Sequence, residues 1–123
     1  MVKKYFSNLE DKISLFQNII NEYSITKKYY NNYKAYISGS IIFKNNSKLF
    51  FTEVKDTEFY RKDKYSYHYM NSENELIFRY DNAYHHPEIK TFPHHKHTKN
   101  AIEESSEPEI DNILFEIKTQ NQL

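Results

Sequence analysis

Two neighbouring segments that alternate aromatic and polar residues constrain the fold more than any other feature of the sequence. They read KYSYHYM and ELIFRYD, and the loop NSEN separates them. Such alternation is typical of β-strands, because successive side chains point to opposite faces of a sheet. Pairing Met70 with Glu75 predicts a hairpin. It would form three cross-strand pairs on one face, namely Tyr69 with Leu76, Tyr67 with Phe78, and Tyr65 with Tyr80.

The two faces of this hairpin differ in character. The aromatic face is expected to pack in the core against a helix, because a sheet must bury one face. The alternative is a platform on which RNA bases stack. The other face carries Ser66, His68, Ile77, Arg79 and Asp81. It leads directly into a segment rich in histidine, so we expect polar chemistry on this second face.

The composition as a whole also favours a sheet. The 123 residues include 12 tyrosines and 9 phenylalanines but only 1 glycine, and aromatic residues favour strands. The absence of cysteine excludes disulfides and cysteine-based zinc sites. A formal net charge of zero argues against a uniformly basic nucleic-acid binder. No apolar run suits a membrane span or a signal peptide, so a cytoplasmic protein is expected.

Helical patterns are predicted towards both ends of the chain. Ser7 and Glu10 form a capping-box pattern, and apolar residues at helical spacing from Leu9 to Tyr23 predict an amphipathic helix of roughly four turns. Proline is favoured in the first turn of a helix, so a last helix is predicted to begin at Pro108. Its inner stripe would hold Ile110, Leu114 and Ile117.

Between these helices the sequence predicts an antiparallel sheet of about four strands. Residues 29–43 read as extended, with Gly39 at a bulge or bend. Residues 49–54 form the next strand after the turn KNNSK, and DTEFYRKDK is a polar connection to the hairpin. The expected fold class is therefore α+β, with an N-terminal helix, this sheet and a C-terminal helix in one domain of residues 1–123.

Five of the six histidines lie between His85 and His97. Closely spaced imidazoles rarely form a core, because each buried ring nitrogen needs a partner. Three interpretations remain open: a metal site, a solvated polar loop, or a catalytic site for metal-independent cleavage of RNA. The metal interpretation would add Glu88 or Asp81 to the imidazoles, but the spacing matches no zinc signature. We therefore expect no bound metal and no other cofactor.

Metal-independent cleavage of RNA needs a base for the 2′-OH proton, an acid for the leaving 5′-oxygen, and cations around the phosphate. In an extended segment, His95 and His97 share one side, with His94 and Lys96 on the other. The candidate catalytic residues are His86, His95 and His97, with Asp81 and Glu88 to orient an imidazole. The candidate residues for binding RNA phosphate are Arg79, Lys96, His85 and Lys90.

Charge is distributed unevenly in the last third of the chain. Residues 90–99 hold three lysines and three histidines with no acid, whereas residues 103–116 hold six acids with no base. Such a distribution suggests either internal pairing or separate surfaces for separate partners.

Two segments, FRYDNAYHHPEIKTFPHHKH and IEESSEPEIDNILFEI, resemble the TumE-like toxin family of prokaryotic toxin–antitoxin systems. The hairpin YSYHYMNSENELIFRYDNA and the stretch GSIIFKNNSKLFFTEV are similar to that family as well, so the resemblance covers residues 39–117. The histidine-containing pieces are its most specific part. The chain departs from the family pattern in two places. Tyr84 stands where proline is expected, and the ends of the strands are rich in lysine rather than arginine. Neither departure removes a candidate catalytic residue.

The resemblance implies a small toxin domain with a RelE-like fold and an RNA-cleaving activity. It also implies two partners: a helix-turn-helix antitoxin that neutralises the toxin, and RNA, free or on the ribosome. One alternative is a non-catalytic binding module whose histidine loop contacts protein or RNA. Another is a metal-dependent hydrolase, which a chelator would inactivate.

Overall fold

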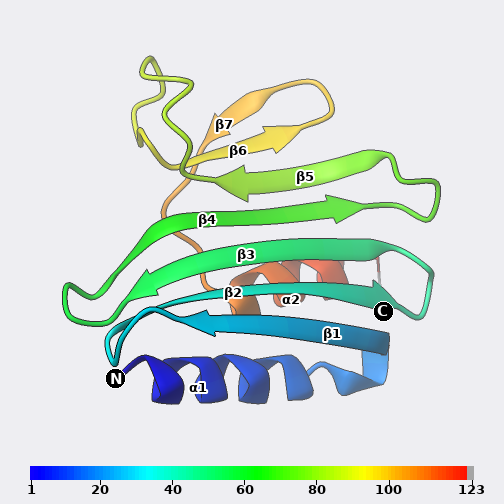
Figure 1. The fold of residues 1–123 in the computed structure, drawn as a ribbon. Helices are drawn as coiled ribbons and strands as arrows, with labels where there is room; N and C mark the ends of the chain where they lie inside the picture. The colour runs from blue at the N-terminus through cyan, green and yellow to red at the C-terminus, as the bar shows by residue number, and fades with distance from the viewer. Residues whose placement is uncertain (122–123) are drawn as a thin grey trace.

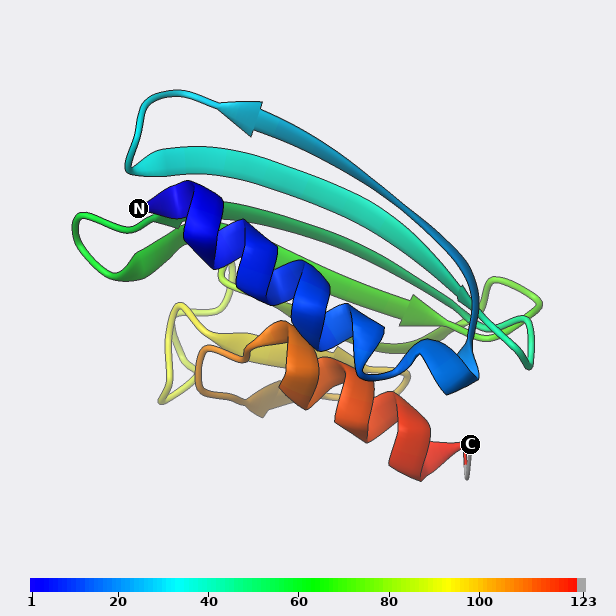
Figure 2. The ribbon, with the colours of Figure 1, turned by 90° about the horizontal axis from the view of Figure 1, so that it is seen from below.

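The computed structural model describes residues 1–121 and contains one antiparallel sheet with two α-helices on one of its faces (Figure 1, Figure 2). The seven strands lie in the sheet in the order of the sequence. Neither α-helix of the described chain has the length and apolar character needed to cross a membrane. The elements are α1 (Val2–Ser14), the 3₁₀ helix η1 (Gln17–Ile19), β1 (Ile20–Tyr29), β2 (Lys34–Phe43), β3 (Lys48–Asp56), β4 (Arg61–Met70), β5 (Leu76–Asp81), β6 (His95–Thr98), β7 (Ile102–Glu104) and α2 (Ile110–Gln120).

The α+β class with a helix towards each end is confirmed, but the sheet has seven strands where about four were expected. The additional strands are β1, β6 and β7. The basic segment and the first two residues of the acidic segment contribute to the β6–β7 hairpin, in which Lys96 pairs with Glu103 along the backbone. The rest of the acidic segment lies in the connection to α2 and in α2 itself. The polar connection expected at residues 56–64 is shorter than predicted, because β4 already begins at Arg61.

The N-terminal helix differs most from the prediction. It begins at Val2 and ends at Ser14, so the Ser7 capping-box pattern lies inside the helix and does not cap it. Residues 20–29, expected in part to continue this helix, form β1 at one edge of the sheet. Almost every β1 side chain is exposed, and an edge strand of this kind has no alternating apolar pattern to reveal it.

Gly39 is not at a bulge. Gly39 pairs with Ile25 on β1 and with Phe51 on β3, and the strand register is regular around it in both pairings. A Cβ at this position would lie 2.6 Å from the Phe51 ring, which is itself buried. Glycine is therefore required to make room for a core aromatic ring.

The β4–β5 hairpin keeps the predicted faces but not the predicted register. Tyr69 pairs with Phe78 and Tyr67 with Tyr80, two residues further along β5 than expected. An irregularity after Tyr69 absorbs the difference, so that Met70 pairs with Leu76. Because side chains alternate with a period of two, a shift of two residues leaves each side chain on its original face.

The aromatic face of the sheet is the core and is not free to stack RNA bases. Both helices cover it, as the two ribbon views show (Figure 1, Figure 2). The sheet contributes the buried rings of Tyr65, Tyr67, Tyr69 and Phe78. The buried stripes of the helices consist of Val2, Phe6, Leu9 and Ile13 from α1 and Ile110, Ile113, Leu114 and Ile117 from α2. Helix α2 begins two residues after Pro108, and Glu109 caps it through a reciprocal capping box with Asn112.

A buried ion pair ties the sheet to α2. The Lys62 ammonium lies 3.6 Å from the Glu53 carboxylate, and both side chains are fully buried. The ammonium also donates hydrogen bonds to the Tyr67 hydroxyl (2.7 Å) and the Pro108 carbonyl (2.5 Å). The hydroxyls of Tyr5 and Tyr67 in turn donate to Glu53, at 2.5 Å each. Burial and the neighbouring Glu53 carboxylate raise the pKa of both hydroxyls, so they remain donors.

Lys62→Met should destabilise the fold strongly. Removing Lys62 leaves the buried Glu53 carboxylate without its counter-charge, and breaking a buried ion pair in this way typically costs about 3–5 kcal/mol. Urea unfolding of the wild type, Lys62→Met and the double variant Lys62→Met/Glu53→Gln measures the effect. The double variant should recover part of the loss, because it removes both charges. A Lys62→Met protein as stable as the wild type would contradict this assignment.

Candidate active site

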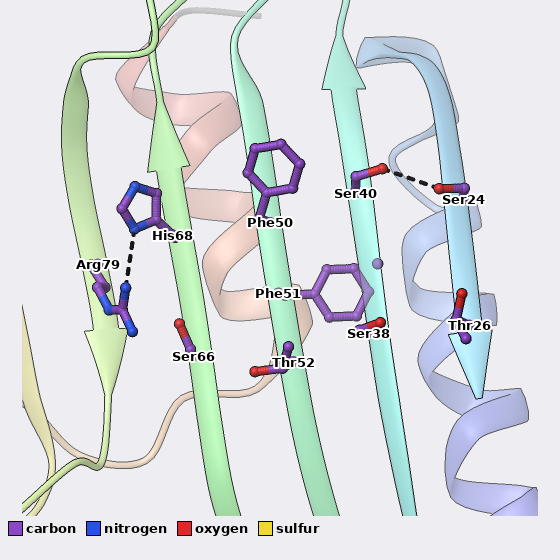
Figure 3. Close-up of a pocket in the computed structure, with 11 residues that line it drawn as sticks. Ser24, Thr26, Ser38, Ser40, Phe50, Phe51, Thr52, Ser66, His68 and Arg79 are labelled. Atoms are coloured by element: carbon purple, nitrogen blue, oxygen red, sulfur yellow. Dashed lines mark hydrogen bonds between the residues drawn. The ribbon is translucent and has the colours of Figure 1, made fainter. Parts of the chain in front are cut away.

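The pairing of β5 with β6 assembles the candidate site. Asp81 lies opposite His95 and Arg79 lies opposite His97 in the antiparallel register. These four side chains share the sheet face that the helices leave open, and Figure 3 shows Arg79 on this face with the helices behind the sheet. The expectation that His95 and His97 share one side is therefore confirmed.

The Asp81 carboxylate is buried and is the centre of this group. Its Oδ2 accepts a hydrogen bond from Arg79 Nε (2.9 Å), and its Oδ1 accepts one from the Ala83 backbone N–H (3.0 Å). His95 Nε2 lies 2.9 Å from Oδ1, and His97 Nε2 lies 3.5 Å from Oδ2. The buried carboxylate needs the Arg79 and Ala83 donors, because an isolated charge is costly in a low dielectric.

His95 is held in one orientation by its other ring nitrogen. Its Nδ1 lies 2.9 Å from the Pro93 carbonyl oxygen, which can only accept, so Nδ1 carries a proton and donates it. Nε2 is buried and makes no aligned hydrogen bond, although Asp81 Oδ1 is within 2.9 Å. Nε2 and Oδ1 are therefore close to each other but not aligned as a donor and an acceptor.

The loop between β5 and β6 brings a third imidazole to the site. The centroid of the His86 ring lies 5.4 Å from that of His95 and 5.7 Å from that of His97. His86 Nδ1 lies 3.1 Å from Glu88 Oε1, which is within hydrogen-bonding distance. The side chains of His86 and His97 are each 26% exposed, whereas His95 is 2% exposed. Only the first two can meet a large substrate.

The protonation of His97 reflects its surroundings. Burial lowers the pKa of its imidazole, and the Asp81 carboxylate opposes this by raising it. The nearby His95, His86 and Arg79 lower the pKa further, and the net shift is downward. A neutral imidazole can accept a proton or another electrophile through its free nitrogen.

The other expected phosphate-binding residues lie apart from this cluster. Lys96 is on the opposite face, where its ammonium donates to Glu116 of α2 (2.9 Å) and lies over the rings of Phe78 and Tyr80. His85 and Lys90 are exposed on the loop, with the His85 ring 6.3 Å from the His86 ring. The structure therefore groups Arg79 with the histidines and separates Lys96 from them.

A hollow beside Asp81 contains residues that sequence reasoning missed. It has a volume of about 240 Å³ and is lined in part by Lys64, Asn82 and Tyr84 together with Arg79. Asn82 is buried and accepts a hydrogen bond from the Tyr65 backbone N–H (3.0 Å), which fixes the chain after β5. The Tyr84 ring is 75% exposed. Lys64 lies near Asp81 only through the fold, whereas Tyr84 follows Asp81 by three residues and no pattern in the sequence gives it a role.

The family described as Toxin TumE matches residues 9–121. The chain belongs to this toxin family. The resemblance noted in the histidine segments and the strands is thereby confirmed over nearly the whole chain. No curated protein and no solved structure matches the chain, so the expected likeness to a RelE fold is unsupported.

The open sheet face of this TumE-family toxin extends away from the histidines as a shallow hydroxyl-lined hollow of about 470 Å³. Figure 3 shows its side chains on β1 to β5. The hydroxyl groups belong to Ser24, Thr26, Ser38, Ser40, Thr52 and Ser66. Arg79 lines both hollows, and its Nη1 lies 3.4 Å from His68 Nδ1. Burial and the Arg79 charge lower the pKa of His68, so this nitrogen acts as an acceptor.

Lys96→Met in this TumE-family toxin should reduce stability without weakening the site. The substitution removes a partly buried ion pair and hydrogen bond to Glu116, which together contribute roughly 1 kcal/mol. Urea unfolding measures that loss, and Glu116→Gln should give a loss of similar size. A Lys96→Met protein of unchanged stability that no longer binds RNA would instead support the phosphate-binding role expected from sequence.

Proposed function

We propose that this toxin is a metal-independent endoribonuclease that cuts RNA with the imidazoles around Asp81. The observation that carries the proposal is the pair of solvent-accessible rings of His86 and His97, with centroids 5.7 Å apart beside Arg79. Cleavage by the 2′-OH needs one group that takes a proton and one that gives a proton, on opposite sides of the same phosphate. Two imidazoles can supply both.

His97 is the general base and His86 is the general acid in this mechanism. His97 Nε2 removes the 2′-OH proton, and the 2′-oxygen attacks the adjacent phosphorus. The bond from phosphorus to the 5′-oxygen breaks, and that oxygen takes the proton that His86 delivers. The products are a 2′,3′-cyclic phosphate and a free 5′-hydroxyl. Glu88, which faces His86 Nδ1, stabilises the protonated acid.

Arg79 offsets the negative charge that develops on the phosphate during this attack. Its Nε is bound to Asp81 and one terminal nitrogen faces His68, which leaves further N–H groups directed at the hollows on the open face. His95 is a positioning residue, because its ring is buried between Asp81 and the Pro93 carbonyl. From the sequence, His95 was a candidate for the general base or the general acid, with His97 or His86 as its counterpart; the proposal gives these two roles to His97 and His86.

The surface around the cluster suits a single strand of RNA. Tyr84 is an exposed aromatic ring at the rim of the hollow beside Asp81, and aromatic side chains stack on bases without regard to sequence. The hydroxyl-lined hollow extends the polar surface beyond Arg79. His85 and Lys90, both exposed on the loop, add donors and positive charge for neighbouring phosphates. The substrate class is cytoplasmic RNA, free or on the ribosome.

An antitoxin partner follows from the toxin family, and we infer a helix-turn-helix protein that covers the histidine loop with acidic residues. Residues 90–99 contain no acid, and both Lys90 and Lys99 are exposed. An acidic segment placed there would also block access to His86 and His97. Inhibition would then be steric and electrostatic, without any change in the toxin fold.

His86→Ala and His97→Ala should each lower the rate of RNA cleavage by about 10²–10⁴-fold, the usual effect of losing one acid–base group. His94→Gln is the matched control. His94 neighbours His95 but faces the helices, and a glutamine amide can keep its hydrogen bond to Tyr65. Cleavage of a labelled RNA in EDTA, with mass analysis of the ends, should give 2′,3′-cyclic or 3′-phosphate products.

Two results would contradict the proposal. A folded His86→Ala/His97→Ala double variant that arrests growth as the wild type does would favour a non-catalytic binding module. Cleavage that EDTA abolishes and an added divalent metal restores would favour a metal-dependent hydrolase. Circular dichroism of each variant checks that the fold is intact.

Reversing the charges of Lys90 and Lys99 should weaken antitoxin binding. The wild-type affinity should fall as salt rises, and the fall should be smaller for Lys90→Glu/Lys99→Glu, because fewer charges attract the partner. Lys28→Glu/Lys44→Glu is a control with the same change in net charge at exposed positions on β1 and in the turn after β2. Calorimetric titration measures each affinity. Equal effects of the two double variants would place the antitoxin on another surface.

A further inference from the structure

Asp81, His95 and His97 have the geometry of a metal site as well as of a catalytic group. We propose that they bind one divalent ion of the zinc class, and that the bound ion switches off RNA cleavage. The binding part of this proposal is independent of the proposed function, whereas the inhibitory part rests on it. One ligand atom from each residue lies within 4.8 Å of the other two.

The tautomer of His95 is the first argument. Because Nδ1–H donates to the Pro93 carbonyl, a neutral His95 has its lone pair on Nε2. The Nε2 atom is buried, lies 2.9 Å from Asp81 Oδ1, and makes no hydrogen bond. Two electron-rich atoms at this distance repel each other unless a cation lies near both. The misaligned approach suits an ion beside the pair better than a proton on the line between them.

The distances are the second argument. Two ligands about 2.1 Å from one tetrahedral ion lie about 3.4 Å apart. The Nε2–oxygen distances to Asp81 are 2.9 Å from His95 and 3.5 Å from His97, and the two imidazole centroids are 4.6 Å apart. The first distance is to Oδ1 and the second to Oδ2, and the three ligand atoms, which all lie within 4.8 Å of one another, would move closer together around a bound ion.

The groups behind the ligands are the third argument. Metal-binding histidines commonly donate their second ring nitrogen to a carbonyl, as His95 does to Pro93, and ligating carboxylates are themselves hydrogen-bonded. Asp81 is held by Arg79 and by the Ala83 backbone N–H. The Arg79 charge repels a cation and lowers the affinity. Its bond is to Oδ2, which His97 also approaches, whereas Oδ1 accepts from the Ala83 N–H and lies 2.9 Å from His95 Nε2.

The donor set selects the kind of ion. Two imidazoles and one carboxylate suit zinc and its neighbours among the transition metals, whereas magnesium and calcium prefer oxygen alone. The histidine spacing in the sequence matched no zinc signature, and the expectation of no metal site rested on that. The third ligand comes from a different strand, so sequence spacing does not reveal it.

A bound ion and the proposed chemistry exclude each other. The ion uses the Nε2 lone pair of His97, which is the atom assigned to take the 2′-OH proton. Zinc should therefore inhibit cleavage by occupying the base, and a chelator should restore activity.

The test is a titration of chelator-treated, untagged protein with Zn²⁺, by calorimetry and by native mass spectrometry. We expect one Zn²⁺ per chain and no response to Mg²⁺. Asp81→Asn and His97→Ala should each weaken Zn²⁺ binding at least tenfold, whereas His94→Gln should leave it unchanged. Co²⁺ as the probe should give visible absorption bands in the wild type that both ligand variants lose. Circular dichroism confirms that each variant is folded.

Absence of stoichiometric Zn²⁺ binding, or binding that neither ligand variant weakens, overturns the metal site and leaves metal-independent cleavage standing. If Zn²⁺ does bind, the RNA-cleavage assay shows whether the bound ion inhibits the reaction or is required for it. Inhibition of cleavage by one equivalent of Zn²⁺, reversed by EDTA, supports the whole proposal. Cleavage that requires bound Zn²⁺ supports the site but overturns both the inhibitory role and the metal-independent mechanism.

Discussion

The site depends on the contacts of one buried group, the carboxylate of Asp81. A negative charge out of water must be compensated, and the chain supplies the Arg79 guanidinium and the Ala83 backbone N–H. The Nε2 atoms of His95 and His97 gather beside the same carboxylate. These contacts exist because β6 pairs with β5 in one register. A slip of one residue would turn His95 and His97 towards the helices and leave the carboxylate without them.

Because side chains alternate along β6, neighbouring residues of this four-residue strand contribute to two different faces of the sheet. His95 and His97 face the open side and meet Asp81, whereas Lys96 faces the core side and binds Glu116 of α2. The helices bury the aromatic face and so fix the sheet, and the uncovered face keeps its polar side chains accessible. In this toxin of the TumE family, the candidate catalytic side chains lie on strands β5 and β6, and the loop between these strands adds His86.

The parts of this structure that local patterns could predict are those with a clear period. Alternation in β4 and β5 gave the correct faces, and the stripe Ile110, Leu114, Ile117 indicated α2. The exposed edge strand β1 and the acidic strand β7 have no such period, so local patterns did not predict them. For the site, shared orientation of His95 and His97 follows from strand geometry. Their distance from Asp81 and the burial of His95 depend on how the loop after β5 brings the chain back to pair with that strand. The spacing of the histidines in the sequence does not determine the path of this loop.

The most direct test of the central claim, that RNA reacts at the imidazoles beside Asp81, is an NMR titration of the six histidine rings. The ligand is an RNA dinucleotide whose attacking 2′-OH is replaced by hydrogen, so that it binds and is not cut. The account predicts that the ring signals of His86 and His97 shift on binding and that those of His94 do not. Shifts confined to other residues, with His86 and His97 unchanged at saturation, would contradict it.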